Sequence, residues 1–188
     1  MLNYIVRSIT NNWAESGFIS DKDKDIYEYG LNLVLFSALN LFAILLTALI
    51  TERLVESVIL IAVTVPLQMF GGGYHAKTHL KCFLIMYLGW WVVMLVAPIM
   101  NTFVTMCIIV LSVSTIFWFA PVAHKNVPIS VGQRNKMKML TRKFVVICAI
   151  ISIFFASDVT GVHKISSHVA IGLGAIAISM VAGKLKYL

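Results

Sequence analysis

The stretch FGGGYHAKTHLKC, residues 70–82, lies between two long apolar runs. Three glycines end the first run, and two histidines, two lysines and a cysteine follow before the second run begins. Glycine tolerates positive φ and the close approach of another backbone, so residues 71–73 can turn the chain back on itself. The stretch therefore predicts a polar turn with reactive side chains at the edge of a membrane.

The composition around this turn is that of an integral membrane protein. The 188 residues are 60% hydrophobic and 12% charged, and the mean hydropathy is +0.90, far from the values of soluble domains. A membrane-spanning helix needs about 20 apolar residues, so we expect about six of them and no large soluble domain. We predict a single all-α membrane domain over residues 1–188. The clustered net charge of +7 indicates membrane topology and anionic lipid contact rather than nucleic acid binding.

Six apolar runs are the expected transmembrane helices. They cover about residues 31–50, 55–70, 82–99, 102–120, 144–157 and 165–182. The second, fifth and sixth are short for a full crossing, which leaves tilt, bilayer thinning or re-entrance open for them. We expect residues 1–29 to be an N-terminal segment without a cleavable signal peptide. Apolar residues recur in it at helical spacing, which predicts an amphipathic helix in the membrane interface, with ordinary packing as the alternative.

The distribution of positive charge predicts the orientation, because Lys and Arg accumulate in cytoplasmic segments. With cytoplasmic N- and C-termini, only Arg53 and Lys164 lie outside. The other basic residues all fall inside: Arg7, Lys22, Lys24, Lys77, Lys81, Lys125, Arg134, Lys136, Lys138, Arg142, Lys143, Lys184 and Lys186. Residues 71–82 and a long basic loop over residues 121–143 are then cytoplasmic.

Cys82 is the candidate nucleophile of the turn. It falls near the predicted N-terminus of a helix and next to Lys81, surroundings that favour a thiolate. His75 precedes it by seven residues, about 10 Å along a straight helix, so His75 needs a bent backbone to accept the thiol proton. His79, three residues before Cys82, is closer on a regular helix, and spacing alone does not decide between them.

Two other interpretations of the turn compete with a catalytic one. His75, His79 and Cys82 form a potential zinc ligand set, but Ala76 stands where zinc peptidases carry a glutamate, so we expect no metal and no cofactor. Alternatively, the histidines are interfacial and the cysteine is passive. Cys107 and Cys148 lie in the middle of apolar runs and are expected to be inert packing residues.

The turn and a second motif resemble the accessory gene regulator B family, membrane cysteine peptidases that process autoinducer propeptides in quorum sensing. The resemblance rests on GGGYHAKTHLKC at residues 71–82 and on FAPVAHKNVP at residues 119–128, and it extends over nearly the whole chain. It implies six spans, with His75 and Cys82 as the catalytic residues. Related sequences commonly carry an arginine just before the glycines, where this chain has Gln68 and Met69.

The resemblance also implies a mechanism and partners. Cys82 would attack a carbonyl of a short propeptide, release its C-terminal tail, and pass the acyl group to a thiol or hydroxyl of the peptide, which closes a thiolactone or lactone ring. The expected partners are this propeptide with an acidic tail, membrane lipid and, as a further candidate, a second copy of the chain. The expected location is the plasma membrane.

The basic run RNKMKMLTRK, residues 134–143, is the expected counter-charge for the tail, with Lys136, Lys138, Arg142 and Lys143 as candidate substrate-binding residues. Contact with lipid headgroups is the alternative for the same cations. A small transporter or peptide exporter is the rival function, since polar residues such as Asn32 and Asn40 occur inside a span. A membrane scaffold is the third, but it leaves Cys82 without a task.

Overall fold

A computed structural model describes residues 2–74, 76, 78–122, 130–156 and 163–187. Within these residues the chain forms α-helices and two short 3-10 helices, and no strand. In chain order they are α1 (Leu2–Glu15), η1 (Asp21–Asp23), α2 (Lys24–Ile50), α3 (Leu54–Gly71), α4 (His79–Val96), η2 (Ala97–Ile99), α5 (Thr102–Phe119), α6 (Val131–Ala156) and α7 (His163–Tyr187). The predicted all-α class is confirmed, and α2 to α7 are six helices long and apolar enough to cross a membrane.

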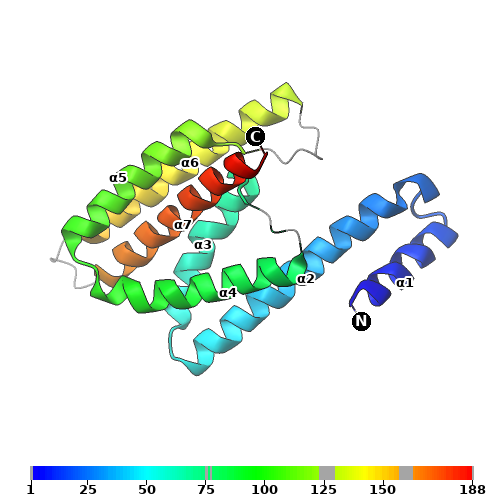
Figure 1. The fold of residues 1–188 in the computed structure, drawn as a ribbon, viewed down its shortest axis with the longest axis horizontal. Helices are drawn as coiled ribbons and strands as arrows, with labels where there is room; N and C mark the ends of the chain where they lie inside the picture. The colour runs from blue at the N-terminus through cyan, green and yellow to red at the C-terminus, as the bar shows by residue number, and fades with distance from the viewer. Residues whose placement is uncertain (1, 75, 77, 123–129, 157–162, 188) are drawn as a thin grey trace.

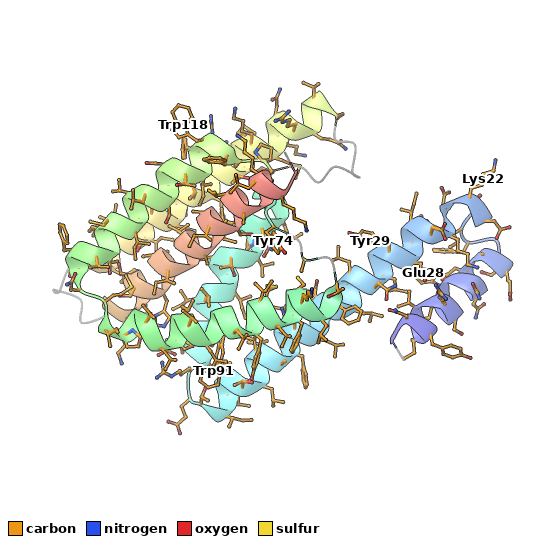
Figure 2. The ribbon with its side chains drawn as sticks, viewed as in Figure 1. Lys22, Glu28, Tyr29, Tyr74, Trp91 and Trp118 are labelled. Atoms are coloured by element: carbon orange, nitrogen blue, oxygen red, sulfur yellow. The ribbon has the colours of Figure 1, made fainter. Side chains whose placement is uncertain are left out.

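Helix α7 is the centre of the bundle, with α3, α5 and α6 packed around it (Figure 1). In its most apolar stretch 56% of the residues are buried, against 17 to 33% for the other five spans. One apolar core joins these four helices through residues such as Leu67, Ile116, Leu173 and Met180. The outward faces carry exposed apolar side chains, including Trp118 on α5 (Figure 2), as expected of a surface that faces lipid.

Helices α2 and α4 lie beside each other on one flank of the bundle (Figure 1). A second apolar core joins them to α3 through Ile44, Leu60, Trp90 and Met94. The indole Nε1 of Trp90 donates a hydrogen bond to Ser57 Oγ (2.9 Å), which fixes the ring in this core. The flank is therefore attached to the bundle through both α3 and α7.

The N-terminal helix α1 packs along the first turns of α2. Val6 and Thr10 are fully buried against it, and Arg7 Nε forms an ion pair with Glu28 Oε1 at 2.9 Å; Figure 2 shows Glu28 facing α1. The structure therefore shows the ordinary helix packing that was the alternative prediction for this segment, here between α1 and α2. The location of α1 in the membrane interface stays a prediction.

Two helices begin earlier in the chain than the apolar runs predicted as their spans. Helix α4 begins at His79 instead of residue 82, because the Thr78 side chain caps it by accepting a hydrogen bond from Lys81 N–H. Helix α6 begins at Val131 instead of residue 144. Ser130 and Gln133 form a capping box there, in which Gln133 N–H donates to Ser130 Oγ (3.2 Å) and Ser130 N–H donates to Gln133 Oε1 (3.1 Å).

These boundaries change two expectations. From Val131 on, the segment predicted as a basic cytoplasmic loop is the start of a 26-residue helix. The fifth and sixth spans, expected to be short, reach 26 and 25 residues, because the polar residues that flank their apolar cores are also helical. Helix α3 has 18 residues, a length of about 27 Å at 1.5 Å per residue, which is also the length of α4 and α5. Of the three spans expected to be short, it is the one that is not extended by flanking polar residues.

Candidate functional site

The glycine turn starts where α3 ends. Gly71 is the last residue of the helix, and Gly72 and Gly73 follow with φ of +70° and +155°. Gly72, with ψ of −164°, occupies a backbone region that is essentially restricted to glycine. The turn that the sequence predicts at residues 71–73 is therefore built on conformations that side chains disfavour.

Segments distant in sequence hold this turn from two sides. On one side, Val122 N–H donates a hydrogen bond to Gly71 O (2.8 Å), and Gly72 pairs with Val122 in a single parallel bridge. A Cβ on Gly72 would overlap the Val122 carbonyl oxygen. The backbone after α5 therefore packs directly on the backbone after α3.

Helix α7 closes the other side of the turn. Tyr74 N–H donates to Ser179 Oγ (3.0 Å), and a Cβ on Gly73 would stand 2.6 Å from the same oxygen. Gly183, one turn further along α7, lies so close that an added Cβ would be 2.7 Å from the carbonyl carbon of Gly73. The end of α3, the end of α5 and the C-terminal end of α7 thus meet at one end of the bundle.

Cys82 lies in the first turn of α4, at this same end. Its N–H donates to Thr78 O (3.1 Å), the first hydrogen bond of the helix, and its side chain is half-buried. Lys81, beside it, is exposed. The cysteine predicted as nucleophile is thus held at a helix N-terminus, as the sequence indicated.

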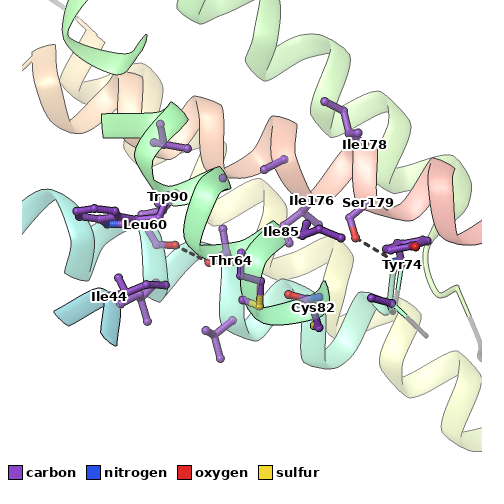
Figure 3. Close-up of a pocket in the computed structure, with 18 of the residues that line it drawn as sticks. Ile44, Leu60, Thr64, Tyr74, Cys82, Ile85, Trp90, Ile176, Ile178 and Ser179 are labelled. Carbon is purple, nitrogen blue, oxygen red and sulfur yellow. Dashed lines mark hydrogen bonds between the residues drawn. The ribbon is translucent and has the colours of Figure 1, made fainter. Parts of the chain in front are cut away.

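A cavity of about 320 Å³ opens beside Cys82 between α2, α3, α4 and α7. Tyr74, Ser179 and Cys82 lie at one end of it, and Leu60 and Trp90 lie at the other (Figure 3). None of its described lining residues carries a formal charge, and apolar side chains form most of the wall. Tyr74 and Ala76 both line the cavity, so the chain borders it immediately before and after residue 75.

This geometry does not decide whether His75 or His79 is the base for Cys82. His75 lies outside the described residues, and of His79 only the backbone, the first residue of α4, is described. Among the described residues there is no group of three His, Cys, Asp or Glu side chains that could hold a metal ion. The choice of base therefore remains a prediction.

The other two cysteines differ in their surroundings. Cys148 is buried in the core that surrounds α7, in agreement with a packing role. Cys107 on α5 is exposed on the outer surface of the helix, so it is not a core packing residue. Neither lines the cavity beside Cys82.

Sequence reasoning missed several residues that the fold brings to this end of the bundle. Lys186 Nζ lies 4.6 Å from the centre of the Tyr74 ring, and Lys184 Nζ lies 4.6 Å from that of Phe119, both within the range of cation–π attraction. From the sequence, Lys184 and Lys186 were used only to predict the orientation of the protein in the membrane. Their closeness to the turn depends on the docking of α7, for which the sequence gives no local signal.

The candidate substrate-binding cations fall into two groups. Arg142 is engaged within the protein: its Nη2 donates to Phe117 O (3.0 Å), and its guanidinium carbon lies 5.1 Å from the Phe117 ring centre. Lys136 and Lys143 are exposed, and Lys138 is half-buried. Arg142 therefore joins α6 to α5, whereas the lysines lie along the first half of α6.

These features define a class: a polytopic α-helical membrane protein with a cysteine at the mouth of an apolar cavity, at one end of the bundle. Over residues 2–182 the chain matches the family model for accessory gene regulator B. The chain belongs to the accessory gene regulator B family, as the sequence resemblance indicated. Its general role is accordingly the processing of autoinducer propeptides, and its substrate is a propeptide of the accessory gene regulator D type. No curated protein and no solved structure matches the chain.

Proposed function

We propose that the chain is a membrane cysteine endopeptidase that cleaves the propeptide through an acyl-enzyme on Cys82 and then cyclises the product. The observation that supports this most is the position of Cys82, half-buried in the first turn of α4 and lining a cavity beside the glycine turn. A nucleophile needs such a site, where a peptide can lie against the sulfur while bulk water is limited.

The proposed chemistry has two steps. In the first, Cys82 Sγ bonds to the carbonyl carbon, the peptide C–N bond breaks, and His75 transfers the thiol proton to the leaving amine of the tail. In the second, a thiol or hydroxyl of the bound peptide attacks the thioester and gives its proton to His75. The bond to Cys82 then breaks, and the ring closes as a thiolactone or lactone. Transfer within the bound peptide requires that water reach the thioester slowly, which a largely apolar cavity favours.

Alanine variants test the dyad. We expect Cys82→Ala and His75→Ala each to abolish cleavage of a co-expressed cognate propeptide while the protein still accumulates in the membrane. Cys107→Ala is the matched control, because it removes a thiol remote from the cavity and should process normally. Full cleavage by Cys82→Ala would refute the proposal. If His79→Ala is inactive and His75→Ala is active, His79 is the base instead.

We also propose that the first half of α6 binds the acidic tail of the propeptide through Lys136, Lys138 and Lys143. Arg142 is less suited to this, because its guanidinium already serves the contact with Phe117. The double reversal Lys136→Glu with Lys138→Glu should slow processing about tenfold, and an acidic-to-neutral change in the tail should remove most of that difference. If the double variant processes the propeptide at the wild-type rate, the lysines do not bind the tail, and contact with lipid headgroups is the interpretation that is left.

The proposed orientation places both termini and Cys82 on the cytoplasmic side, as the distribution of Lys and Arg favours. The ends of α3, α5 and α7 and the start of α4 all lie at one end of the bundle, which is consistent with a shared side. A fluorescent protein fused to the C-terminus should fluoresce, whereas an active alkaline phosphatase fusion there would contradict this orientation.

A further inference from the structure

The cavity beside Cys82 follows one face of α4. Its α4 lining residues are Cys82, Ile85, Met86, Gly89, Trp90 and Val93, which recur at helical spacing. The last lies eleven positions after the first, about 16 Å along a helix. The cavity therefore extends along α4 from its first turn towards its middle, with Cys82 near one end and Trp90 near the other (Figure 3).

The far end of the cavity is closed by rigid groups. Trp90 is only 2% exposed, and its indole is bonded to Ser57, while Leu60 and Ile44 are buried beside it. Towards the lipid the wall is more open, since Ile85 is 53% and Ile178 is 73% exposed. An apolar group can thus enter from the membrane edge and come to rest against a fixed floor.

Gly89 provides part of the cavity's free space. It lies in the middle of α4, is exposed, and has no atom within 4 Å of the position that a Cβ would take. Glycine within a helix costs stability relative to alanine, about 1 kcal/mol in exposed helices, and no backbone contact or unusual φ accounts for it here. Gly89 thus leaves open space in the wall that α4 contributes to the cavity.

The geometry of thioester formation indicates which part of a peptide would occupy this space. When Sγ bonds to the scissile carbonyl, the Cβ of the residue that contributes the carbonyl lies only about 3 to 4 Å from the sulfur. That side chain must therefore contact the walls that surround Cys82. Because the described walls carry no charged group, an uncharged apolar side chain fits there, and a charged one would lose its hydration without a partner.

The leaving side of the peptide has a different environment. Lys81 is exposed next to Cys82. Lys186 lies over the aromatic ring of Tyr74, which lines the cavity at the same end as Cys82. A polar tail is accommodated at this end of the bundle far better than in the cavity. This difference in polarity favours an arrangement in which the residue before the cleaved bond occupies the cavity and the released tail lies beside Lys81 and Lys186.

We propose, on the basis of the function proposed above, that this cavity is the specificity pocket for a bulky apolar side chain immediately before the cleaved bond, and that Gly89 sets its capacity. The volume of about 320 Å³ is at the lower end of the range for ligand pockets, which suits one or a few side chains rather than a folded segment. Leucine at this peptide position is therefore preferred over alanine.

Filling the cavity from Gly89 tests this proposal. The experiment compares two forms of the cognate propeptide, with Leu or Ala immediately before the bond that mass spectrometry identifies as cleaved. We expect the wild-type protein to process the Leu form at least about tenfold faster. In Gly89→Phe the Leu form should lose this advantage, while the Ala form is still processed, because the phenyl ring takes the space and leaves Cys82 in place.

Gly30→Phe is the matched control, since Gly30 also lies in a helix with nothing within 4 Å of an added Cβ and does not line the cavity. It should keep the wild-type preference for Leu. Gly89→Ala gives a graded version, with a smaller loss of preference. Membrane accumulation and alkylation of Cys82 by a maleimide confirm in each variant that the protein is folded and the thiol is accessible.

Several results would overturn the inference. These are an undiminished Leu preference in Gly89→Phe, no preference in the wild type, or an equal loss on both propeptides. An intact preference in Gly89→Phe combined with loss of a phospholipid that co-purifies with the wild type would identify the cavity as a lipid site. Failure of the proposed function looks different, because Cys82→Ala would then still process both forms.

Discussion

Glycines border the same site at two places, and they do so for opposite reasons. At Gly72 and Gly73 the backbone conformation disfavours a side chain, and atoms of Val122 and Ser179 already occupy the place of a Cβ. At Gly89 the backbone is regular helix, and nothing lies within 4 Å of that place. The first position fixes the turn against α7 and the segment after α5, and the second keeps a cavity open. Glycine thus serves close packing in one case and free space in the other.

Among substitutions of these glycines, we expect Gly72→Ala to reduce propeptide cleavage the most. The change places a methyl group against the Val122 carbonyl and requires a backbone conformation that costs about 1 to 3 kcal/mol outside glycine. Displacement of the turn by about 1 Å is enough to slow catalysis about a hundredfold. The measurement is the initial rate of propeptide cleavage in membranes that contain equal amounts of protein.

Gly17→Ala is the control for Gly72→Ala. Gly17 also has a positive φ, +73°, but no atom lies within 4 Å of an added Cβ, and it belongs to the turn after α1. It should also carry a conformational penalty, because of the positive φ, and leave the cleavage rate within about twofold. Equal loss of activity in both variants would mean that general destabilisation, and not the contact with Val122, explains the effect.

A smaller effect is expected for Gly183→Ala, which approaches the same turn from α7. The added methyl group would be 2.7 Å from the carbonyl carbon of Gly73, but alanine in a helix offsets the strain by up to about 1 kcal/mol. We expect cleavage to slow about tenfold with little change in the thermal unfolding temperature in detergent. Gly132→Ala on α6, where an added Cβ meets nothing within 4 Å, should process normally. A wild-type rate in Gly183→Ala would show that the turn tolerates displacement from this side.

The sequence predicted the features that depend on local composition. Six spans follow from hydropathy, and the position of Cys82 in the first turn of α4 follows from the polar interruption at residues 71–81. The start of α6 was also accessible in principle, because Ser130 and Gln133 have the spacing of a capping box. It was missed because the density of charge in residues 134–143 was interpreted as a loop.

The tertiary features of the site were not accessible from one sequence. Nothing local relates Val122 or Gly183 to the glycine turn, since the first lies about 50 residues and the second about 110 residues further along the chain. The role of Gly89 depends in the same way on the helices that enclose the cavity together with α4. The sequence could mark these glycines as unusual, but only the packing distinguishes a tight contact from an open space.

The most direct test of the account is to trap the acyl group on Cys82. A propeptide whose cyclising thiol or hydroxyl has been removed cannot accept the acyl group, so the thioester should accumulate. After acid quenching, we predict that intact-mass and peptide analysis finds the N-terminal part of the propeptide attached to Cys82, and that the adduct is absent in Cys82→Ala. Attachment to a different residue, or release of the tail by Cys82→Ala, would contradict the account.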